Sequence, residues 1–129
     1  MITLQEIFDK VATHLRKQGH RSFDSDGYLV SHAPNGDMDP VGVIVPKDEM
    51  PNEFRHKTLF SGSPLRSWMK ERIGVRQTHL LHYHQNIHDH WGPAVEYGKT
   101  RPVDLEAGLK QVASRFDLKY TEPGNEVKS

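Results

Sequence analysis

The sequence predicts a single α+β domain in which a small antiparallel β-hairpin packs against about four helices. The chain has 129 residues, enough for one hydrophobic core but not for two. Four segments have apolar residues at helical spacing, and two short runs of β-branched and aromatic residues lie between turn-forming residues. We place the domain at residues 1–121 and expect residues 122–129, which contain a single apolar side chain, to form a disordered tail.

The composition excludes several classes of protein. The 17 basic and 17 acidic side chains balance, so the chain as a whole has no electrostatic attraction for nucleic acid. The absence of cysteine excludes a disulfide scaffold, a thiol nucleophile and a cysteine-based zinc site. The sequence has neither a signal peptide nor an apolar run of about 18 residues, so we expect a soluble cytoplasmic protein with no membrane partner. Nothing in the composition specifies an oligomeric state.

The first helix is expected from residue 4 to about residue 18, where apolar side chains recur every three or four positions. Thr3 and Glu6 have the spacing of a capping box, in which each side chain accepts a hydrogen bond from the other's backbone N–H. Gly19 is placed where a helix commonly ends in a left-handed conformation. Both ends of this helix are therefore specified by nearby residues.

The predicted β-hairpin pairs residues 28–30 with residues 41–45. Both runs are rich in β-branched or aromatic side chains, and turn-forming residues around Asn35 and Gly36 separate them. The connection is longer than a tight turn requires, so a protruding loop is expected. Pro46 ends the second run, and residues 47–58 are expected to be irregular.

Three more helices follow. Ser63 and Pro64 are a typical N-cap and first residue, and Gly74 follows the last apolar residue of this segment. A third helix is expected over residues 78–91 and a fourth over residues 102–118.

Several short motifs occur together between residues 3 and 118. They are Leu-Gln-Glu-Ile-Phe-Asp at 4–9, His-Leu-x-x-Gln-Gly at 14–19, Ala-Pro-Asn-Gly at 33–36, Val-Gly-Val-Ile-Val-Pro at 41–46, Asp-Glu at 48–49 and Ile-His-Asp at 87–89. With these motifs the chain resembles a family of small uncharacterised proteins of tailed bacteriophages and prophages. The resemblance implies no enzymatic activity. Two positions depart from the family: Asp39-Pro40 replaces a common Lys-Cys pair, and His84 replaces a common leucine.

Five of the nine histidines lie within twelve residues of the third expected helix, namely His79, His82, His84, His88 and His90. At 100° per residue, His84 and His88 are neighbours one turn apart, and His79 and His82 form a second pair on the opposite side. Two imidazoles one turn apart can hold zinc, so His84 and His88 are the candidate metal ligands, and Zn²⁺ is the alternative to a chain without cofactor. Neither pair has the glutamate between its histidines that the catalytic His-Glu-x-x-His pattern supplies.

The histidines also have structural interpretations. His84 and His88 lie at the edge of the buried stripe, where a neutral imidazole with a hydrogen-bond partner is tolerated. His79, His82 and His90 face solvent and form a candidate partner-binding surface whose charge can change between pH 5 and 8.

The pair His88-Asp89 allows an enzymatic alternative. Metal-dependent phosphohydrolases of the HD type place a His, a His-Asp pair and a distant Asp around a divalent metal. The corresponding set in this chain is His56, His88, Asp89 and Asp117. This alternative rests on one dipeptide.

Charges are unevenly distributed along the chain. Residues 22–53 have seven acidic side chains and one basic side chain, and residues 54–76 have six basic side chains and one acidic side chain. Either the two segments neutralise each other within the fold, or they bind a partner, with Asp37, Asp39, Arg66 and Lys70 as candidate contacts. Six basic side chains beside an acidic segment neutralise few phosphates, so nucleic-acid binding through residues 54–76 is expected to be weak or absent.

The leading hypothesis is a non-enzymatic accessory protein of the phage type that binds a host or defence macromolecule, namely a host or phage protein, in an interaction that can be inhibitory. It follows from the family resemblance, the small single domain and the lack of a complete catalytic constellation in the sequence.

Overall fold

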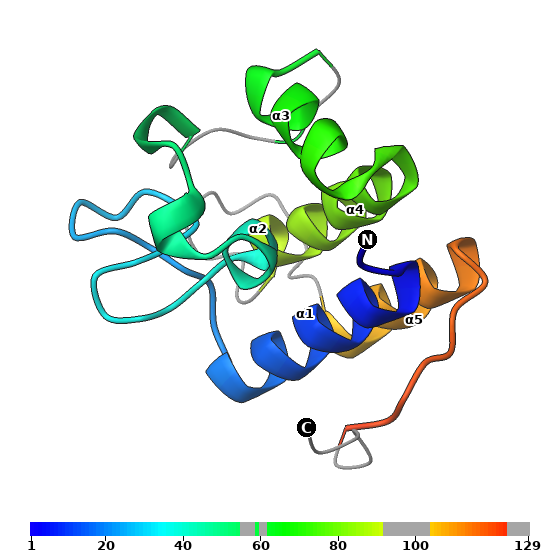
Figure 1. Cartoon of the computed structure of the whole chain (residues 1–129). Helices are drawn as coiled ribbons and strands as arrows, with labels where there is room; N and C mark the ends of the chain where they lie inside the picture. Colours follow the sequence, from blue (N-terminus) through cyan, green and yellow to red (C-terminus); the bar gives the residue numbers. More distant parts are fainter. Residues whose placement is uncertain (55–58, 60–61, 92–103, 124–129) are drawn as a thin grey trace.

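The structure, a computed structural model, describes residues 1–54, 59, 62–91 and 104–123. This part of the chain contains α-helices and short 3₁₀ helices but no β-strand (Figure 1). The α-helices are α1 (Leu4–Gln18), α2 (Pro40–Ile44), α3 (Pro64–Ile73), α4 (Val75–His90) and α5 (Leu105–Arg115), and the 3₁₀ helices are η1 (Lys47–Glu49) and η2 (Asn52–Phe54). The predicted α+β class is therefore wrong, because the described part is helical.

Helix α4 is the centre of the fold, since α1, α2, α3 and α5 all pack against it. Helix α1 also contacts α2 and α5. In Figure 1, α1 and α5 lie along the lower side of the molecule, and α3 lies above α4. The core between them includes the fully buried side chains of Ile7, Phe8, Leu15, Leu65, Met69, Leu80, Leu81 and Leu109.

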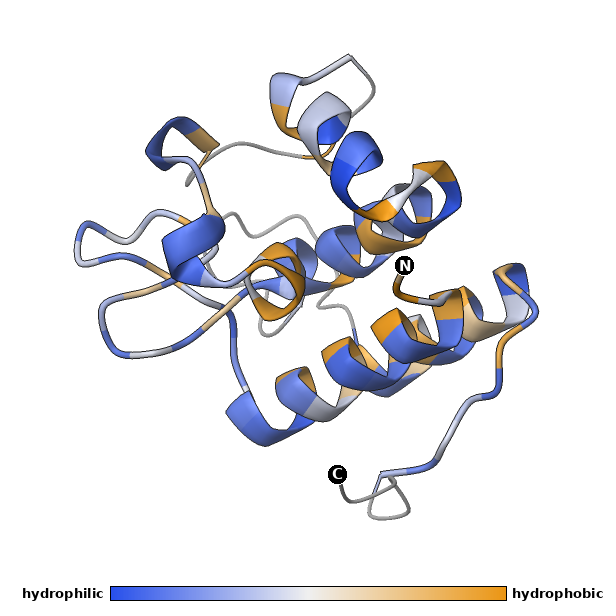
Figure 2. Ribbon diagram, viewed as in Figure 1, coloured by the Kyte–Doolittle hydropathy of each residue, from blue (hydrophilic) through white to orange (hydrophobic). Residues whose placement is uncertain are grey.

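Helix α1 has the boundaries and caps that the sequence predicts. The Thr3 hydroxyl accepts a hydrogen bond from the Glu6 N–H (3.1 Å), and the Glu6 carboxylate accepts one from the Thr3 N–H (3.0 Å). Gly19 ends the helix at φ 79°. Apolar residues repeat along one side of the helix, as Figure 2 shows, and this side is buried.

The predicted second strand of the hairpin is instead the helix α2. The Asp39 carboxylate accepts a hydrogen bond from the Gly42 N–H (2.8 Å), and Pro40 is at the start of the helix, so Asp39-Pro40 is a helix start signal. Gly42 allows a close approach, because a Cβ there would lie 2.0 Å from the Ser31 carbonyl oxygen. The β-branched residues that suggested a strand are thus in a single helical turn, which packs on α1 and α4.

The predicted first strand is replaced by two consecutive turns with one isolated bridge each. In the first turn the Asp24 carboxylate accepts from the backbone N–H groups of Asp26 and Tyr28 (2.9 and 3.0 Å), and Phe23 is bridged to Leu29. The second turn is closed by the bridge between His32 and Met38. Each turn contains a glycine at positive φ, Gly27 and Gly36.

Helices α3, α4 and α5 confirm the three helices predicted after residue 63, with shifted ends. Ser63 caps α3, and the apolar residues Leu105, Leu109, Val112 and Phe116, spaced three or four apart in and just after α5, are buried. Helix α4 begins at Val75, three residues before Thr78, because Gly74 both ends α3 and precedes α4. Helix α5 ends at Arg115, and Asp117 then has a positive φ of 56°.

The chain after α5 returns along α1. Gln5 bonds to the backbone N–H and C=O of Lys119 (2.9 and 3.0 Å), and the Arg16 guanidinium donates to the Thr121 carbonyl (2.7 Å). Of the tail predicted over residues 122–129, positions 122 and 123 are described, and residues 124–129 lie outside the described residues.

Candidate functional site

Helix α4 has a buried side and an open side. Its buried residues include Leu80, Leu81, His84, Ile87 and His88. The open side follows the spacing of three and four that places residues on one face of a helix, and it consists of His79, His82, Tyr83, Asn86 and His90. Three of these five residues are the histidines that the sequence predicts to face solvent. His79 and His90 are exposed as predicted, whereas His82 is half-buried and its Nδ1 is buried.

A cluster that we name the cationic–aromatic face is formed on this side of α4 by Arg66, Arg76, His79, His82, Tyr83, Arg115 and Phe116. The His79 ring lies 5.2 Å from the Tyr83 ring and 5.5 Å from the Phe116 ring, measured between centroids. The Arg115 guanidinium lies 4.6 Å from the Tyr83 ring centroid, and Arg66 Nη2 is 3.3 Å from His79 Nδ1. Helices α3, α4 and α5 therefore all contribute to one cluster.

The electrostatics of this face are positive. Partial burial lowers the pKa of His79, and the positive charges of Arg66 and Arg115 lower the same pKa further. Among the described residues, no carboxylate forms an ion pair with Arg66, Arg76 or Arg115. Burial and then the Arg66 charge lower the pKa of His82 also, whereas the Asp89 carboxylate opposes this shift. Within the described part of the chain, the charges of these arginines are thus not paired with acids.

The rings of the face pack on one another. The Tyr83 ring contacts the Phe116 ring at 5.6 Å with an interplanar angle of 74°, and Arg115 lies over the same tyrosine. Arg66 is held by its hydrogen bond to the Leu59 carbonyl (2.8 Å). Arg66 and Arg115 are therefore each held by a contact within the protein before any partner binds.

A groove of about 500 Å³ continues from this face between α4 and α5. It is lined by Tyr83, Asn86, Ile87 and His90 of α4 and by Gly108, Gln111, Val112 and Arg115 of α5. The candidate binding residue His90 lies here, at the end of α4 farthest from His79.

The structure brings together some of the candidate partner-binding residues. Arg66, His79 and His82 belong to the cationic–aromatic face. Lys70 is exposed one turn farther along α3 than Arg66, and the contacts that join the face do not involve it.

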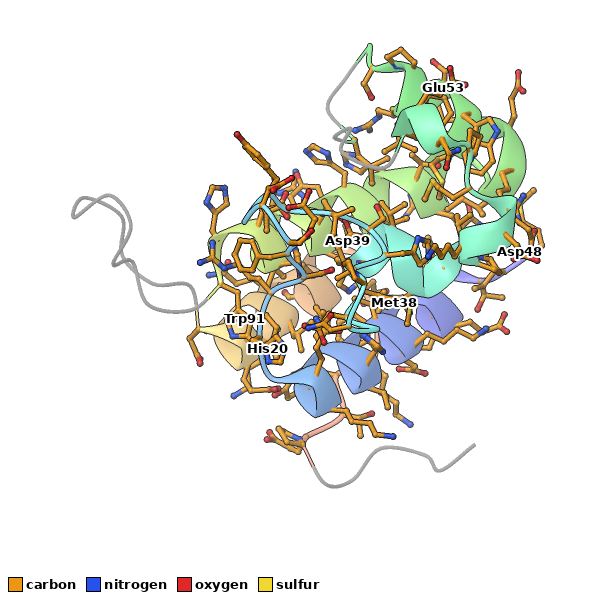
Figure 3. The ribbon with its side chains drawn as sticks, turned by 90° about the vertical axis from the view of Figure 1, so that its left-hand side faces the viewer. His20, Met38, Asp39, Asp48, Glu53 and Trp91 are labelled. Carbon is orange, nitrogen blue, oxygen red and sulfur yellow. The ribbon has the colours of Figure 1, made fainter. Side chains whose placement is uncertain are left out.

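Asp39 is the N-cap of α2 (Figure 3), and Asp37 lies in the loop before it; neither takes part in the contacts that join the cationic–aromatic face. Asp37 forms an ion pair with His20 (2.6 Å). Asp39 is buried, and its carboxylate accepts hydrogen bonds from the Gly42 N–H, the Ser31 hydroxyl (3.2 Å) and the Gln85 amide (3.0 Å). Burial raises the pKa of Asp39. Asp39 therefore acts inside the fold rather than as a surface contact.

The candidate metal ligands His84 and His88 are both fully buried, deeper than the edge position that the sequence suggests. The Ser22 N–H donates to His88 Nε2 (3.0 Å), so Nδ1 has the proton and donates to the Asp89 carboxylate (2.9 Å). His84 packs on the Phe8 ring, and within the described ranges neither of its ring nitrogens has a hydrogen bond of normal geometry. Burial lowers the pKa of His84 to about 3, and the backbone of Leu80 opposes this shift. In the described ranges, no three His, Cys, Asp or Glu side chains are grouped where they could hold a metal ion.

The described members of the alternative phosphohydrolase set, His88, Asp89 and Asp117, are not assembled. Asp117 follows Phe116, whose ring packs on His79, and His79 is nine residues, or about two and a half turns, from His88 along α4. The Asp89 carboxylate already accepts from His88 and from the Gln85 amide. His56 lies outside the described residues.

The sequence did not identify Tyr83, Arg76, Arg115 and Phe116 as site residues. Tyr83 shares the open stripe of α4 with the histidines, and this spacing was a usable signal. Arg115 and Phe116 reach the face only because α5 packs against α4, and this packing is not encoded in any local pattern.

None of the helices in the described part is long and apolar enough to cross a membrane. No protein-family model matches this chain, and no match is found among curated proteins or solved structures.

Proposed function

We propose that this chain is a non-enzymatic binding protein that recognises an acidic surface of another protein through its cationic–aromatic face. The observation that supports this most is the group of three arginines around His79 and Tyr83 without a neutralising carboxylate in the described part. Positive groups of this kind attract and orient an acidic partner.

The residue types of the face, and the contacts that hold two of its arginines, suit a protein partner. Arginine and tyrosine are the residue types most enriched among the contacts that dominate protein–protein affinity. Because Arg66 is held by the Leu59 carbonyl and Arg115 by the Tyr83 ring, little side-chain entropy remains to be lost on binding.

The same geometry disfavours nucleic acid. Proteins that bind single strands offer free aromatic faces on which bases stack. The ring of Tyr83 is instead covered by Arg115 and contacted at its edges by His79 and Phe116. Three arginines neutralise few phosphates, so weak binding is the expectation at physiological salt.

The resemblance to tailed-phage proteins extends this proposal to a biological setting. In that setting the partner is a host or phage protein, such as a component of host defence that the chain inhibits, and the encounter takes place in the host cytoplasm. In this setting we expect the chain to bind an acidic surface of its partner.

Affinity capture from host lysate with the immobilised chain and two variants tests this proposal. Arg76→Glu/Arg115→Glu reverses two exposed charges of the face, and Lys10→Glu/Lys17→Glu makes the same change in charge on α1, outside the face. We expect an acidic protein that the wild type and the α1 variant retain and the face variant loses. Equal capture by all three proteins contradicts the proposal.

A further inference from the structure

The groove between α4 and α5 has the form of a helix-binding site. Its α4 wall consists of residues 83, 86, 87 and 90, and its α5 wall of residues 108, 111, 112 and 115. Both walls therefore follow the spacing i, i+3, i+4, i+7, so the groove runs along about two turns of each helix.

The two helices run in opposite directions along the groove. Arg115 lies over Tyr83 at one end, and Gly108 meets Ile87 toward the other. A Cβ at Gly108 would be 3.0 Å from Ile87 Cγ1, so glycine allows the helices to approach closely at that end. The Arg115 end opens onto the cationic–aromatic face.

The lining of the groove selects its occupant by charge. The floor includes the apolar side chains of Ile87 and Val112, and the rim has the polar groups of Asn86, His90, Gln111 and Arg115. No carboxylate is among the described residues that line it. An occupant with apolar residues on one side and carboxylates at its edge satisfies both parts of the lining.

The described part also excludes one common alternative. Recognition by strand addition requires an exposed sheet edge, and residues 1–54, 59, 62–91 and 104–123 contain no sheet. An amphipathic helix can instead bind in the groove between α4 and α5.

Building on the proposed function, we propose that the partner inserts an acidic amphipathic helix into the groove between α4 and α5. Its apolar residues contact Ile87 and Val112, and its carboxylates lie at the Arg115 end, next to the cationic–aromatic face. The groove thus supplies shape selectivity, and the face supplies charge selectivity.

A peptide titration tests this inference. The probe is a synthetic peptide of about 16 residues built from Glu, Ala and Leu, with the leucines at i, i+3, i+4 and i+7. A control peptide has the same composition with the leucines dispersed around the helix. Amide chemical shifts of the isotope-labelled chain locate the contact, and fluorescence anisotropy gives the affinity.

Three variants identify the groove. Gln111→Glu places a carboxylate on its rim at an exposed helical position and is expected to weaken binding about fivefold or more by like-charge repulsion. Lys110→Gln changes the net charge by the same amount at the adjacent position, which does not line the groove, and should change the affinity by less than about twofold. Arg76→Glu alters the face but not the groove, and separates the two proposals.

The inference is supported if the peptide with its leucines on one side shifts the amide signals of residues 83–90 and 108–115. The control peptide should not shift them, and Gln111→Glu should reduce the shifts. Absence of such shifts at about 1 mM peptide, where even weak complexes are populated, contradicts it. If Arg76→Glu weakens peptide binding and Gln111→Glu does not, the groove is not the binding site, and the proposed function still stands. If the chain alone forms a dimer that Gln111→Glu dissociates, the occupant is a second copy and the inference is wrong.

Discussion

At the scale of the single residue, His84 is a fully buried polar group of α4. Among the described residues, no group forms a hydrogen bond of normal geometry with either ring nitrogen. Replacing a buried polar group that has no partner by an apolar group of similar size removes its desolvation penalty. We expect His84→Leu to raise the free energy of unfolding by about 1–2 kcal/mol in urea denaturation. A loss of stability would show that His84 has a native partner.

His84 also makes stability depend on pH. Burial lowers its pKa to about 3, whereas an unfolded histidine titrates near 6.5. As pH falls from 6.5 towards 3, the unfolded chain binds a proton that the folded chain does not, so this residue reduces stability by about 1.4 kcal/mol per pH unit. The stability advantage of His84→Leu should therefore grow by about 2 kcal/mol between pH 7 and pH 5.

Denaturation of both proteins at the two pH values checks this prediction. The raised pKa of buried Asp39 acts in the opposite direction, because its folded form holds a proton more tightly than its unfolded form. Asp39 is present in both proteins, so its contribution cancels in the comparison. Parallel pH profiles for wild type and His84→Leu would be inconsistent with a neutral, buried imidazole.

His88 connects two distant parts of the chain. Its Nε2 accepts a hydrogen bond from the backbone N–H of Ser22, 66 residues away. His88→Ala leaves this buried N–H without its acceptor and removes one of the two donors to the Asp89 carboxylate, so it should cost about 1–3 kcal/mol. His90→Ala, at an exposed position of the same helix, should change stability by less than about 0.5 kcal/mol. Equal effects of the two substitutions would argue against this role of His88.

At the scale of the element, α2 depends on Asp39. Its carboxylate caps the helix and also accepts from Ser31 and Gln85 inside the fold. Asp39→Ala should therefore cost about 2–4 kcal/mol, more than the loss of an exposed cap such as Asp104→Ala, which should cost about 1 kcal/mol. Urea denaturation of both variants measures the difference. Similar losses would mean that the internal bonds of Asp39 contribute little.

The sequence predicted those elements whose signals agree at every level. In α1, the apolar period, the Thr3–Glu6 capping box and Gly19 all specify the same helix. In α2, a run of β-branched residues conflicts with the helix start at Asp39-Pro40, and packing on α1 and α4 decides the outcome. The segment before it contains two turn signals, at Asp24 and Asn35, and each closes its own loop instead of joining two strands.

At the scale of the whole molecule, the candidate site is a product of packing. Spacing along α4 was enough to group His79 with His82 on one open side. Predicting that Arg66 of α3 and Arg115 of α5 join them would have required knowledge of how α3 and α5 pack on α4. Local patterns contain no information on those positions, so the positive character of the face could not be predicted.

The charged segments do meet within the fold, at one place in the described part. Arg72 of α3 forms an ion pair with Glu49 of η1, and its guanidinium lies 5.3 Å from the Trp68 ring centroid. Asp39 is buried and Asp37 pairs with His20 in its own loop, whereas Arg66 contacts α4. Apart from the Arg72–Glu49 pair, the charged side chains named here therefore make their contacts in separate parts of the fold.

This distribution leads to a negative prediction for nucleic acid. A labelled single-stranded DNA of about 20 nucleotides should bind with a Kd above about 10 µM at about 150 mM salt, because few arginines contact phosphates together. Sub-micromolar binding that Arg76→Glu/Arg115→Glu abolishes would make nucleic acid, rather than an acidic protein, the ligand of the face.

One measurement tests most directly whether the cationic–aromatic face recognises acidic protein surfaces. It is the affinity of the chain for fluorescent poly-L-glutamate of about 20 residues, measured by anisotropy. We predict binding that weakens with salt, falls about tenfold or more in Arg76→Glu/Arg115→Glu, and falls much less in Lys10→Glu/Lys17→Glu, which carries the same net charge. Equal weakening in the two variants would show that only net charge matters. It would contradict a specific acidic-partner site on α4.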